Sequence, residues 1–412
     1  MSPSPNDPSS PFRGWHVAWA AFVVAVLGWG VGFYGPPIFL LAVQQARGWP
    51  VTLIGGAITC HFLIGAAVVA WLPALHGRLG VAGGTRLGGV LAGLGVLGWA
   101  LAAEPWQLFA ATLLSGAGWA LTGGAAINAM VAPWFSRRRP AALSLAYNGA
   151  SVGGALFSPL WVALIAGLGF TQAALLLGGV MAGMLWWLSG RYFAAGPEAW
   201  GQRPDGLVVP VAGPMPKPAP TLPGARLWRD RGFVTLALAA ALSLFAQIGL
   251  IVHLFSLIAV PLGAQAAGFA AGLATGCAIL GRSLIGWLMP EAADRRRIAA
   301  ANYGVQAVGS LLLLASGGTQ VPLLLAGLVL FGLGLGNVTS LPPMIVQRDF
   351  TAGDAARAVA LVTACGQAAY AFAPAGFSLL RDGSGSPALF LAAAALQLAA
   401  AVVVLAGRRG GG

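Results

Sequence analysis

The sequence predicts an all-α integral membrane protein with twelve transmembrane helices in two six-helix bundles. Of the 412 residues, 58% are hydrophobic and only 8% are charged, whereas a soluble domain has about 25% charged residues. The apolar residues form uncharged blocks of about 20 to 28 residues, long enough for a helix to cross a hydrocarbon core of about 30 Å. A membrane β-barrel would instead show alternating blocks of about ten residues. Composition and block length together predict the class.

Glycines, prolines and charged residues divide the chain into twelve apolar blocks. They cover about residues 15–42, 51–73, 83–103, 106–132, 141–166, 169–193, 231–261, 264–289, 298–317, 320–346, 355–380 and 386–407.

The longest connection, residues 194–230, is rich in proline and lacks apolar periodicity, which predicts a cytoplasmic linker. It divides the blocks six and six. We therefore expect two bundles, residues 15–193 and 231–407, with a substrate site at their interface near the bilayer midplane. A disordered N-terminal tail, residues 1–14, and a short C-terminal tail, residues 408–412, complete the chain.

The lysines and arginines predict the orientation. Of the 22 in the chain, nineteen lie in the tails and in the connections on the side of the termini, and two, Arg47 and Arg381, lie on the opposite side. The remaining one is Arg282. This asymmetry follows the positive-inside rule and places both termini in the cytoplasm. We expect the protein in the inner membrane of a bacterium.

Several classes of function are excluded by what the sequence lacks. The three cysteines, Cys60, Cys277 and Cys365, lie in separate apolar blocks, without the spacing of a metal site or a disulfide framework. No P-loop motif is present, and the glycine-rich runs follow no predicted strand, so we expect no nucleotide cofactor. The net charge is +12, but the charged residues lie between the apolar blocks, whereas a nucleic-acid-binding protein gathers them in a basic patch. We expect no cofactor, no metal, no nucleic-acid partner and no enzyme activity.

Arg282 is the one charged residue deep inside an apolar block, and no Asp or Glu lies well inside a predicted span. It precedes Pro290 by about 12 Å of helix rise, so its side chain reaches the headgroups only in part. An arginine near the bilayer centre costs about 2.5 to 3.5 kcal/mol. We expect Arg282 to bind an anionic substrate, because a guanidinium stays protonated and presents a planar fork to a carboxylate. A structural role, with carbonyl or amide partners, is the alternative.

Two histidines are further candidates. His253 lies in the opposite half of its span from Arg282, about 10 Å away in depth on ideal helix geometry. It is therefore assigned to the other end of the substrate, to an outer gate or to proton coupling, with a packing histidine as the alternative. His61, on the second predicted span, is a second candidate for proton coupling.

Five stretches resemble the major facilitator superfamily, and within it the monocarboxylate-porter-like group of bacterial monocarboxylate and oxalate-formate type. They are "WFSRRRPAALSLAYNGASVGG" from Trp134, "ILGRSLIGWLMPEAADRRR" from Ile279, "YGPPIFLLAVQQARGW" from Tyr34, "FGLGLGNVTSLPP" from Phe331 and "APAGFSLLRDGSGSPALF" from Ala373.

This resemblance implies the major facilitator fold and assigns Arg282 as the carboxylate ligand. It also implies cavity-lining positions for the neutral residues of the spans that usually line the cavity in this superfamily, although each could instead be an interhelical hydrogen-bonding residue. These residues are Tyr34, Asn337, Gln367 and Tyr370.

The connections that the family uses for gating differ here from its pattern. The family usually has Asp-Arg-x-Gly between the second and third spans, whereas "GRLG" places Gly77 at the acidic position; in the second half Pro290 takes that place, although acid and arginine follow closely. The candidate loop and gating residues are Arg78, Arg138, Arg139, Asp294 and Arg295.

The sequence as a whole predicts a monomeric secondary transporter of small organic anions, chiefly monocarboxylates, working in the lipid bilayer by alternating access. Proton symport would need His253 or a substrate that crosses as its acid, and exchange of one anion for another is equally compatible. The alternatives are an exporter of a neutral or hydrophobic compound, with Arg282 structural, and a membrane sensor or enzyme. The last class is disfavoured because neither a catalytic cluster nor an extra soluble domain is evident.

Overall fold

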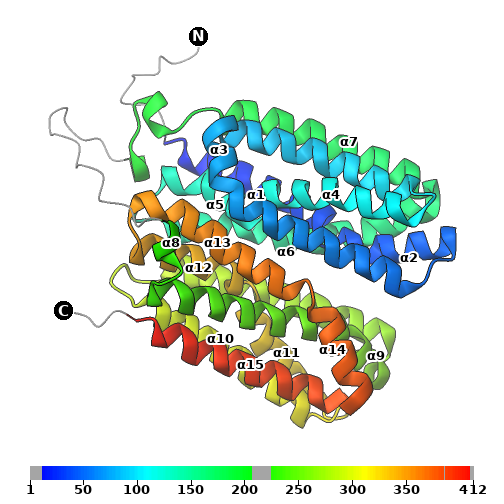
Figure 1. Cartoon of the computed structure of the whole chain (residues 1–412). Coiled ribbons are helices and arrows are strands. Elements are labelled where there is room, and N and C mark those ends of the chain that lie inside the picture. Colours follow the sequence, from blue (N-terminus) through cyan, green and yellow to red (C-terminus); the bar gives the residue numbers. More distant parts are fainter. Residues whose placement is uncertain (1–11, 207–223, 385, 409–412) are drawn as a thin grey trace. The chain divides into compact units, whose positions relative to one another are not determined.

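The computed structural model describes residues 12–206, 224–384 and 386–408, and every regular element in these ranges is a helix (Figure 1). The chain divides into two compact units. Unit 1 comprises residues 1–221 together with 351–360, and unit 2 comprises residues 222–350 and 361–412. The prediction of an all-α protein is confirmed for the described residues.

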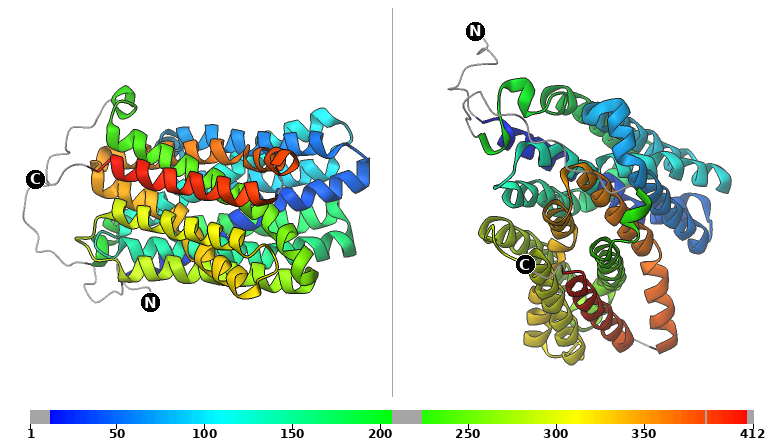
Figure 2. Two further views of the ribbon diagram at one scale, coloured as in Figure 1. Left: turned by 90° about the horizontal axis from the view of Figure 1, so that it is seen from below. Right: turned by 60° about the vertical axis from the view of Figure 1, so that its left-hand side comes forward.

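The helices of unit 1 lie side by side, with α3 packed between α4 and α7 and with α1 against α6 (Figures 1 and 2). The long helix α3 is interrupted at Gly80, whose φ of 69° and ψ of 165° are outside the helical region. A positive φ of this kind suits glycine. The kink separates the predicted spans 51–73 and 83–103. The elements of unit 1 are α1 (Gly14–Gly32), α2 (Gly35–Arg47), α3 (Val51–Leu101), α4 (Pro105–Thr122), α5 (Gly124–Val131), η1 (Ala132–Trp134), α6 (Arg139–Leu168), α7 (Phe170–Leu188), η2 (Ser189–Phe193), η3 (Pro197–Trp200) and η4 (Pro204–Gly206). Element η2 is a single turn of π-helix, which we call the π-turn.

Unit 2 is built around α9 and α10, which pack against α11 and α15. Its α13 begins within the segment 351–360 of unit 1 and continues into unit 2. Its elements are α8 (Gly224–Leu227), α9 (Arg231–Leu288), α10 (Arg295–Ala315), α11 (Val321–Leu335), α12 (Asn337–Asp349), α13 (Ala352–Tyr370), α14 (Ala373–Ser384) and α15 (Ser386–Ala406).

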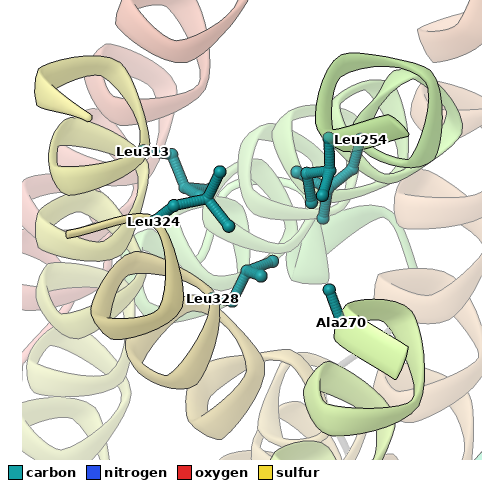
Figure 3. Packing of buried hydrophobic residues seen from close by; sticks show 6 residues of the cluster. Leu254, Ala270, Leu313, Leu324 and Leu328 are labelled. Atoms are coloured by element: carbon teal, nitrogen blue, oxygen red, sulfur yellow. The ribbon is translucent and has the colours of Figure 1, made fainter. Parts of the chain in front are cut away.

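Helix α9 is too long for one membrane crossing, because its 58 residues would extend about 87 Å if straight. Leu254 and Ala270 belong to one buried cluster with Leu313, Leu324 and Leu328 (Figure 3). A straight helix would hold Leu254 and Ala270 about 24 Å apart. The chain therefore turns back between them, which agrees with the predicted spans 231–261 and 264–289.

Ten helices of the described chain are long and apolar enough to cross a membrane, judged by length and composition. One of them, Val51–Leu101, contains two predicted spans on either side of the Gly80 kink. The predicted eighth span corresponds to the shorter apolar helix Gly272–Leu288. The twelve predicted spans thus all have helical counterparts.

Several spans are interrupted by short breaks, and one break in each unit is followed by a Pro-Pro pair. In unit 1, α1 ends at Gly32 and α2 begins at Gly35, just before the adjacent prolines Pro36 and Pro37. Proline has no backbone N–H, so Pro36 cannot donate the helical hydrogen bond to the carbonyl of Gly32. In unit 2, α11 ends at Leu335 and α12 begins after Gly336, upstream of a second Pro-Pro pair, residues 342–343. Such breaks leave backbone carbonyls that need donors from elsewhere.

Candidate functional site

Arg282 lies on the second half of α9, and only 3% of its surface is exposed. Its Nε donates a hydrogen bond of 2.7 Å to the carbonyl oxygen of Gly336, at the break between α11 and α12. The hydrogen bond holds one edge of the guanidinium against a neighbouring helix. The sequence predicted the depth of Arg282 but could not predict this backbone acceptor.

Close backbone packing sets the position of Arg282 relative to α11. A Cβ atom added to Gly281 would collide with the carbonyl oxygen of Leu333, and one added to Gly336 would collide with that of Ala278. A Cβ on Gly332 would lie 2.8 Å from the carbonyl oxygen of Ala274. These three glycines, Gly281, Gly332 and Gly336, form what we call the glycine seam. Small residues of this kind let membrane helices approach closely, and here the seam places the Gly336 carbonyl within reach of Arg282.

The acidic residues of the described chain all lie in connections or in the first or last turn of a helix. They are Glu104, Glu198, Asp205, Asp230, Glu291, Asp294, Asp349, Asp354 and Asp382. The interior of unit 2 therefore contains a buried cation and, among the described residues, no carboxylate from the middle of a helix. A buried environment of this charge attracts an anion.

Asn337 follows the break directly and is buried, with 1% exposure. Its Nδ2 donates to Oδ1 of Asn302 on α10 at 3.0 Å and to the carbonyl of Leu333 at 3.1 Å. Asn302 in turn donates to the carbonyl of Gly334 at 3.1 Å. The two amides thus hold the broken segment on α10. Sequence reasoning missed Asn302, although an amide in an apolar span was a signal that could have found it.

His253 is buried on the first half of α9, with its Nε2 3.4 Å from the hydroxyl oxygen of Ser378 on α14. Nearby, a Cβ on Gly249 would collide with the ring of Phe377, so α9 and α14 approach closely here. His253 and Arg282 therefore lie on the two different limbs of α9, and both belong to unit 2.

His61, on α3, is 1% exposed, and both of its ring nitrogens have partners. Nε2 lies 2.9 Å from the carbonyl oxygen of Gly32, and Nδ1 lies 2.8 Å from the hydroxyl oxygen of Ser115. The Gly32 carbonyl is the one to which Pro36 cannot donate a helical hydrogen bond. Trp99 also donates to Ser115, at 3.2 Å. This geometry favours a structural histidine that replaces the missing donor at the break between α1 and α2.

The other predicted cavity residues are distributed between the units. Tyr34 is half-buried at the break between α1 and α2, and a Cβ on Gly154 would collide with its ring. Gln367 and Tyr370 are buried near the end of α13, with 3% and 5% exposure, and Oε1 of Gln367 accepts no hydrogen bond in the described chain. Their roles as substrate ligands stay predictions.

The predicted gating arginines of unit 1 stabilise the connection before α6. Arg139 donates to the carbonyl oxygens of Phe135, at 2.6 Å, and Ala132, at 3.1 Å. The backbone N–H of Arg138 donates to the carboxylate of Asp205, as do those of the two preceding residues. Asp205 belongs to the predicted linker, whose first part is folded onto unit 1. Arg78 is exposed, two residues before the kink at Gly80.

In unit 2, Asp294 caps α10 by accepting hydrogen bonds from the backbone N–H of Arg296 and Arg297. Arg408 also donates to it, at 2.7 Å. Partial burial raises the pKa of Asp294, but these hydrogen bonds and the charge of Arg408 outweigh that effect, so the pKa is lowered overall. The adjacent Arg295 donates to the carbonyl of Met344.

Arg296 was not predicted as a site residue, yet it is the buried arginine of the "DRRR" run, with 3% exposure. Its Nε forms a 2.7 Å salt bridge with Asp349 at the end of α12. Its other nitrogens donate to the carbonyls of Gly232 and Val404. Arg296 therefore joins four helices at one end of unit 2.

The described residues form only helices, with long apolar spans, broken helices and a buried arginine, and these are features of a membrane transport protein. The family model described as "Major Facilitator Superfamily" matches residues 20–374. The chain therefore belongs to this superfamily of transporters and is not an enzyme.

Relatives and a solved structure agree with this assignment. The chain is 28% identical to human monocarboxylate transporter 11, over 98% of this chain and 85% of that protein. It is 31% identical to rat monocarboxylate transporter 13, over 42% of this chain and 40% of that protein. The crystal structure of a variant of the Escherichia coli fucose:proton symporter matches 96% of this chain and 100% of that chain, with a TM-score of 0.69 and 16% identity. This last similarity confirms the major facilitator fold alone.

Proposed function

We propose that the protein is a secondary active transporter of small organic anions, chiefly monocarboxylates, and that Arg282 binds the substrate carboxylate during alternating access. The observation that carries the proposal is a buried guanidinium whose orientation is set by the carbonyl of Gly336. The similarity to monocarboxylate transporters over nearly the whole chain supports the choice of substrate class.

The chemistry of arginine suits both tasks. A guanidinium has five N–H donors in a rigid plane, and the hydrogen bond from Nε to the Gly336 carbonyl sets the direction of that plane. A carboxylate aligned with that plane accepts two parallel charge-assisted hydrogen bonds. Because Arg282 contacts Gly336, carboxylate binding in this proposal acts directly on the break between α11 and α12.

For proton-coupled transport, we propose His253 as the proton carrier. The ring nitrogens of His61 are engaged by Gly32 and Ser115, so protonation of the ring would require the Ser115 hydroxyl to change from donor to acceptor. Anion exchange needs no protein proton carrier. The charge asymmetry of the connections supports cytoplasmic termini.

A second candidate function is export of a neutral compound, with Arg282 purely structural. The same hydrogen bond to Gly336 favours it, because that bond joins two helices whether or not an anion is present. The two functions differ in what the guanidinium does beyond this bond.

Counterflow in proteoliposomes separates them. Labelled lactate, pyruvate, oxalate and formate are offered to the wild type, to Arg282→Lys and to Arg47→Lys, an exposed control at the end of α2. We expect saturable anion uptake that falls about 10- to 100-fold in Arg282→Lys, because an ammonium cannot bind Gly336 and form a planar fork together. Absence of uptake by the wild type would refute anion transport, and equal uptake by Arg282→Lys would remove the arginine from it.

Coupling is tested by a pH jump across the same vesicles. If transport is proton symport through His253, His253→Ala abolishes proton-driven accumulation but keeps counterflow. Unchanged accumulation would exclude His253 as the proton carrier.

A further inference from the structure

Three arginines of unit 1 gather at the end of the bundle where α1 begins and α7 ends. Arg13 immediately precedes α1, Arg86 lies on α3 and Arg191 lies in the π-turn η2. The π-turn packs against both α1 and α3. Arg86 reaches the turn, since its Nη2 lies 3.0 Å from the point where a Cβ on Gly190 would be. We call this group the arginine cluster.

Aromatic rings, rather than carboxylates, neighbour each guanidinium of the cluster. Arg13 lies 3.5 Å from the ring centroid of Trp200, Arg86 lies 5.1 Å from that of Trp186, and Arg191 lies 5.4 Å from that of Tyr192. None of the three arginines forms a salt bridge within the described residues, and the nearby Glu198 of η3 is exposed. Cation–π contacts stabilise the guanidinium positions but leave the positive charge uncompensated.

Two observations indicate that the cluster is suited to binding an anion. The Nε atom of Arg86 is buried and donates to no acceptor in the described chain, which is costly for a charged donor. Burial lowers the pKa of Arg13, and the charge of Arg191 lowers it further, against an opposing effect of Tyr192. Arg13 and Arg191 therefore repel each other, and a bound anion would relieve this repulsion.

The surroundings of the cluster indicate where that anion comes from. Trp186 and Trp187, in the last turn of a membrane span, are 56% and 58% exposed. Exposed tryptophans at the ends of spans lie among lipid headgroups. Trp186 is itself the ring beneath Arg86, so the cluster continues the lipid-facing surface.

We propose that the arginine cluster binds the phosphate of an anionic phospholipid headgroup, with Trp186 and Trp187 against its acyl region. Arg86 supplies the buried donor, and Arg191 the exposed one. Binding would join α1, α3 and η2 through the headgroup. This site is separate from Arg282, so its test is independent of the transported substrate.

The test measures lipid binding to the purified full chain in a neutral detergent. Phosphatidylglycerol, phosphatidylcholine and glycerol phosphate are titrated, with the melting temperature and native mass spectrometry as readouts. The proteins are the wild type, Arg86→Gln, Arg191→Gln, Arg191→Lys and the control Arg47→Gln, which removes one arginine at the other end of the first span.

We expect phosphatidylglycerol to bind and to raise the melting temperature more than phosphatidylcholine does. Each glutamine variant should bind phosphatidylglycerol about five-fold more weakly, whereas Arg47→Gln and Arg191→Lys stay close to the wild type. Quenching of tryptophan fluorescence by brominated phosphatidylglycerol should fall in Trp186→Phe.

Equal binding of the two lipids would overturn the proposal, as would an equal loss in Arg47→Gln and Arg191→Gln. An effect of glycerol phosphate as large as that of the lipid would assign the cluster to a small soluble anion instead. If Arg86→Gln does not fold, the exposed Arg191 variants decide the question alone.

Discussion

His61 in unit 1 and Arg282 in unit 2 occupy comparable places. Each is a buried side chain that contacts the carbonyl of a glycine at which a neighbouring span is broken, Gly32 for His61 and Gly336 for Arg282. A Pro-Pro pair follows each break. In each unit a buried polar side chain thus contacts a backbone carbonyl at a helix break inside a membrane span.

The difference between the two residues lies in what their chemistry allows beyond this task. An imidazole has only two ring nitrogens, and both contacts of His61, with Gly32 and Ser115, are within the bundle. A guanidinium can make the same structural contact and still offer a charged planar fork. We therefore predict a ligand site at Arg282 and not at His61, because only the guanidinium has more donors than a single backbone carbonyl accepts.

The largest expected effect is on the glycine seam. Gly281→Ala places a methyl group against the carbonyl of Leu333, and such overpacking costs up to about 3 kcal/mol. We expect a large fall in melting temperature, measured by size-exclusion chromatography of heated samples. Gly276→Ala, on the same helix with nothing within 4 Å of the added methyl group, should be neutral or stabilising. Equal melting temperatures of the two variants would show that the close packing at Gly281 does not stabilise the position of Arg282.

His61→Ala should destabilise the protein by about 2 kcal/mol, because it removes packing volume and strands the Gly32 carbonyl and Ser115. His61→Gln, which keeps a donor and an acceptor, should recover about half of the loss. Melting temperatures and uptake measured across pH 5 to 8 check both variants, with pH 5 to 8 chosen to bracket the ordinary histidine pKa of about 6.5. If the pH profile of uptake shifts in His61→Gln, His61 carries a proton during transport. Its role would then not be purely structural, and the contrast with Arg282 would be wrong.

Pro36→Ala tests whether His61 contacts the Gly32 carbonyl because proline lacks an N–H. The alanine restores an N–H that can reach the Gly32 carbonyl, so the loss caused by His61→Ala should be smaller in the Pro36→Ala background. A double-mutant cycle on the free energies of unfolding should give a coupling energy of about 1 kcal/mol between Pro36 and His61. Additive effects would show that the proline does not explain the histidine.

The smallest effect concerns the helix caps. The pKa of Asp294 lies below its ordinary value of 3.8, so the ionised carboxylate stabilises the folded state above that value, and this stabilisation is lost as the pH falls through the lowered folded pKa. Asp294→Asn should therefore lower the free energy of unfolding by under about 1 kcal/mol at neutral pH, and by less below about pH 4. Glu198→Gln, a change at an exposed acid of η3, serves as the control. A constant difference between Asp294→Asn and wild type down to pH 3 would contradict the assignment.

Much of the fold followed from the sequence, because apolar blocks of about 20 residues and a one-sided distribution of arginines are typical of membrane-spanning helices. Arg282 was equally visible, since a cation in an apolar run stands out by composition. Its acceptor was not, because the Gly336 carbonyl belongs to the backbone and its proximity to Arg282 depends on how closely Gly336 packs against α9.

Other site features depend on helix phase and long-range packing. Within "DRRR", three identical arginines follow Asp294, and only the direction set by the capped first turn of α10 buries Arg296 rather than Arg295. Asp205 was hidden for a different reason: its partners, the N–H groups before α6, are about 70 residues earlier in the chain. No local pattern reports such a pairing.

Gly281, Gly332 and Gly336 carry no side-chain atoms, yet each controls how closely α9 approaches α11. An unbiased genetic selection for inactive alleles should therefore recover substitutions at these three codons as readily as at codon 282. The positions at which substitution impairs Arg282 then include glycines that do not contact the substrate. These glycines are sensitive because the packed surface leaves no room for a methyl group.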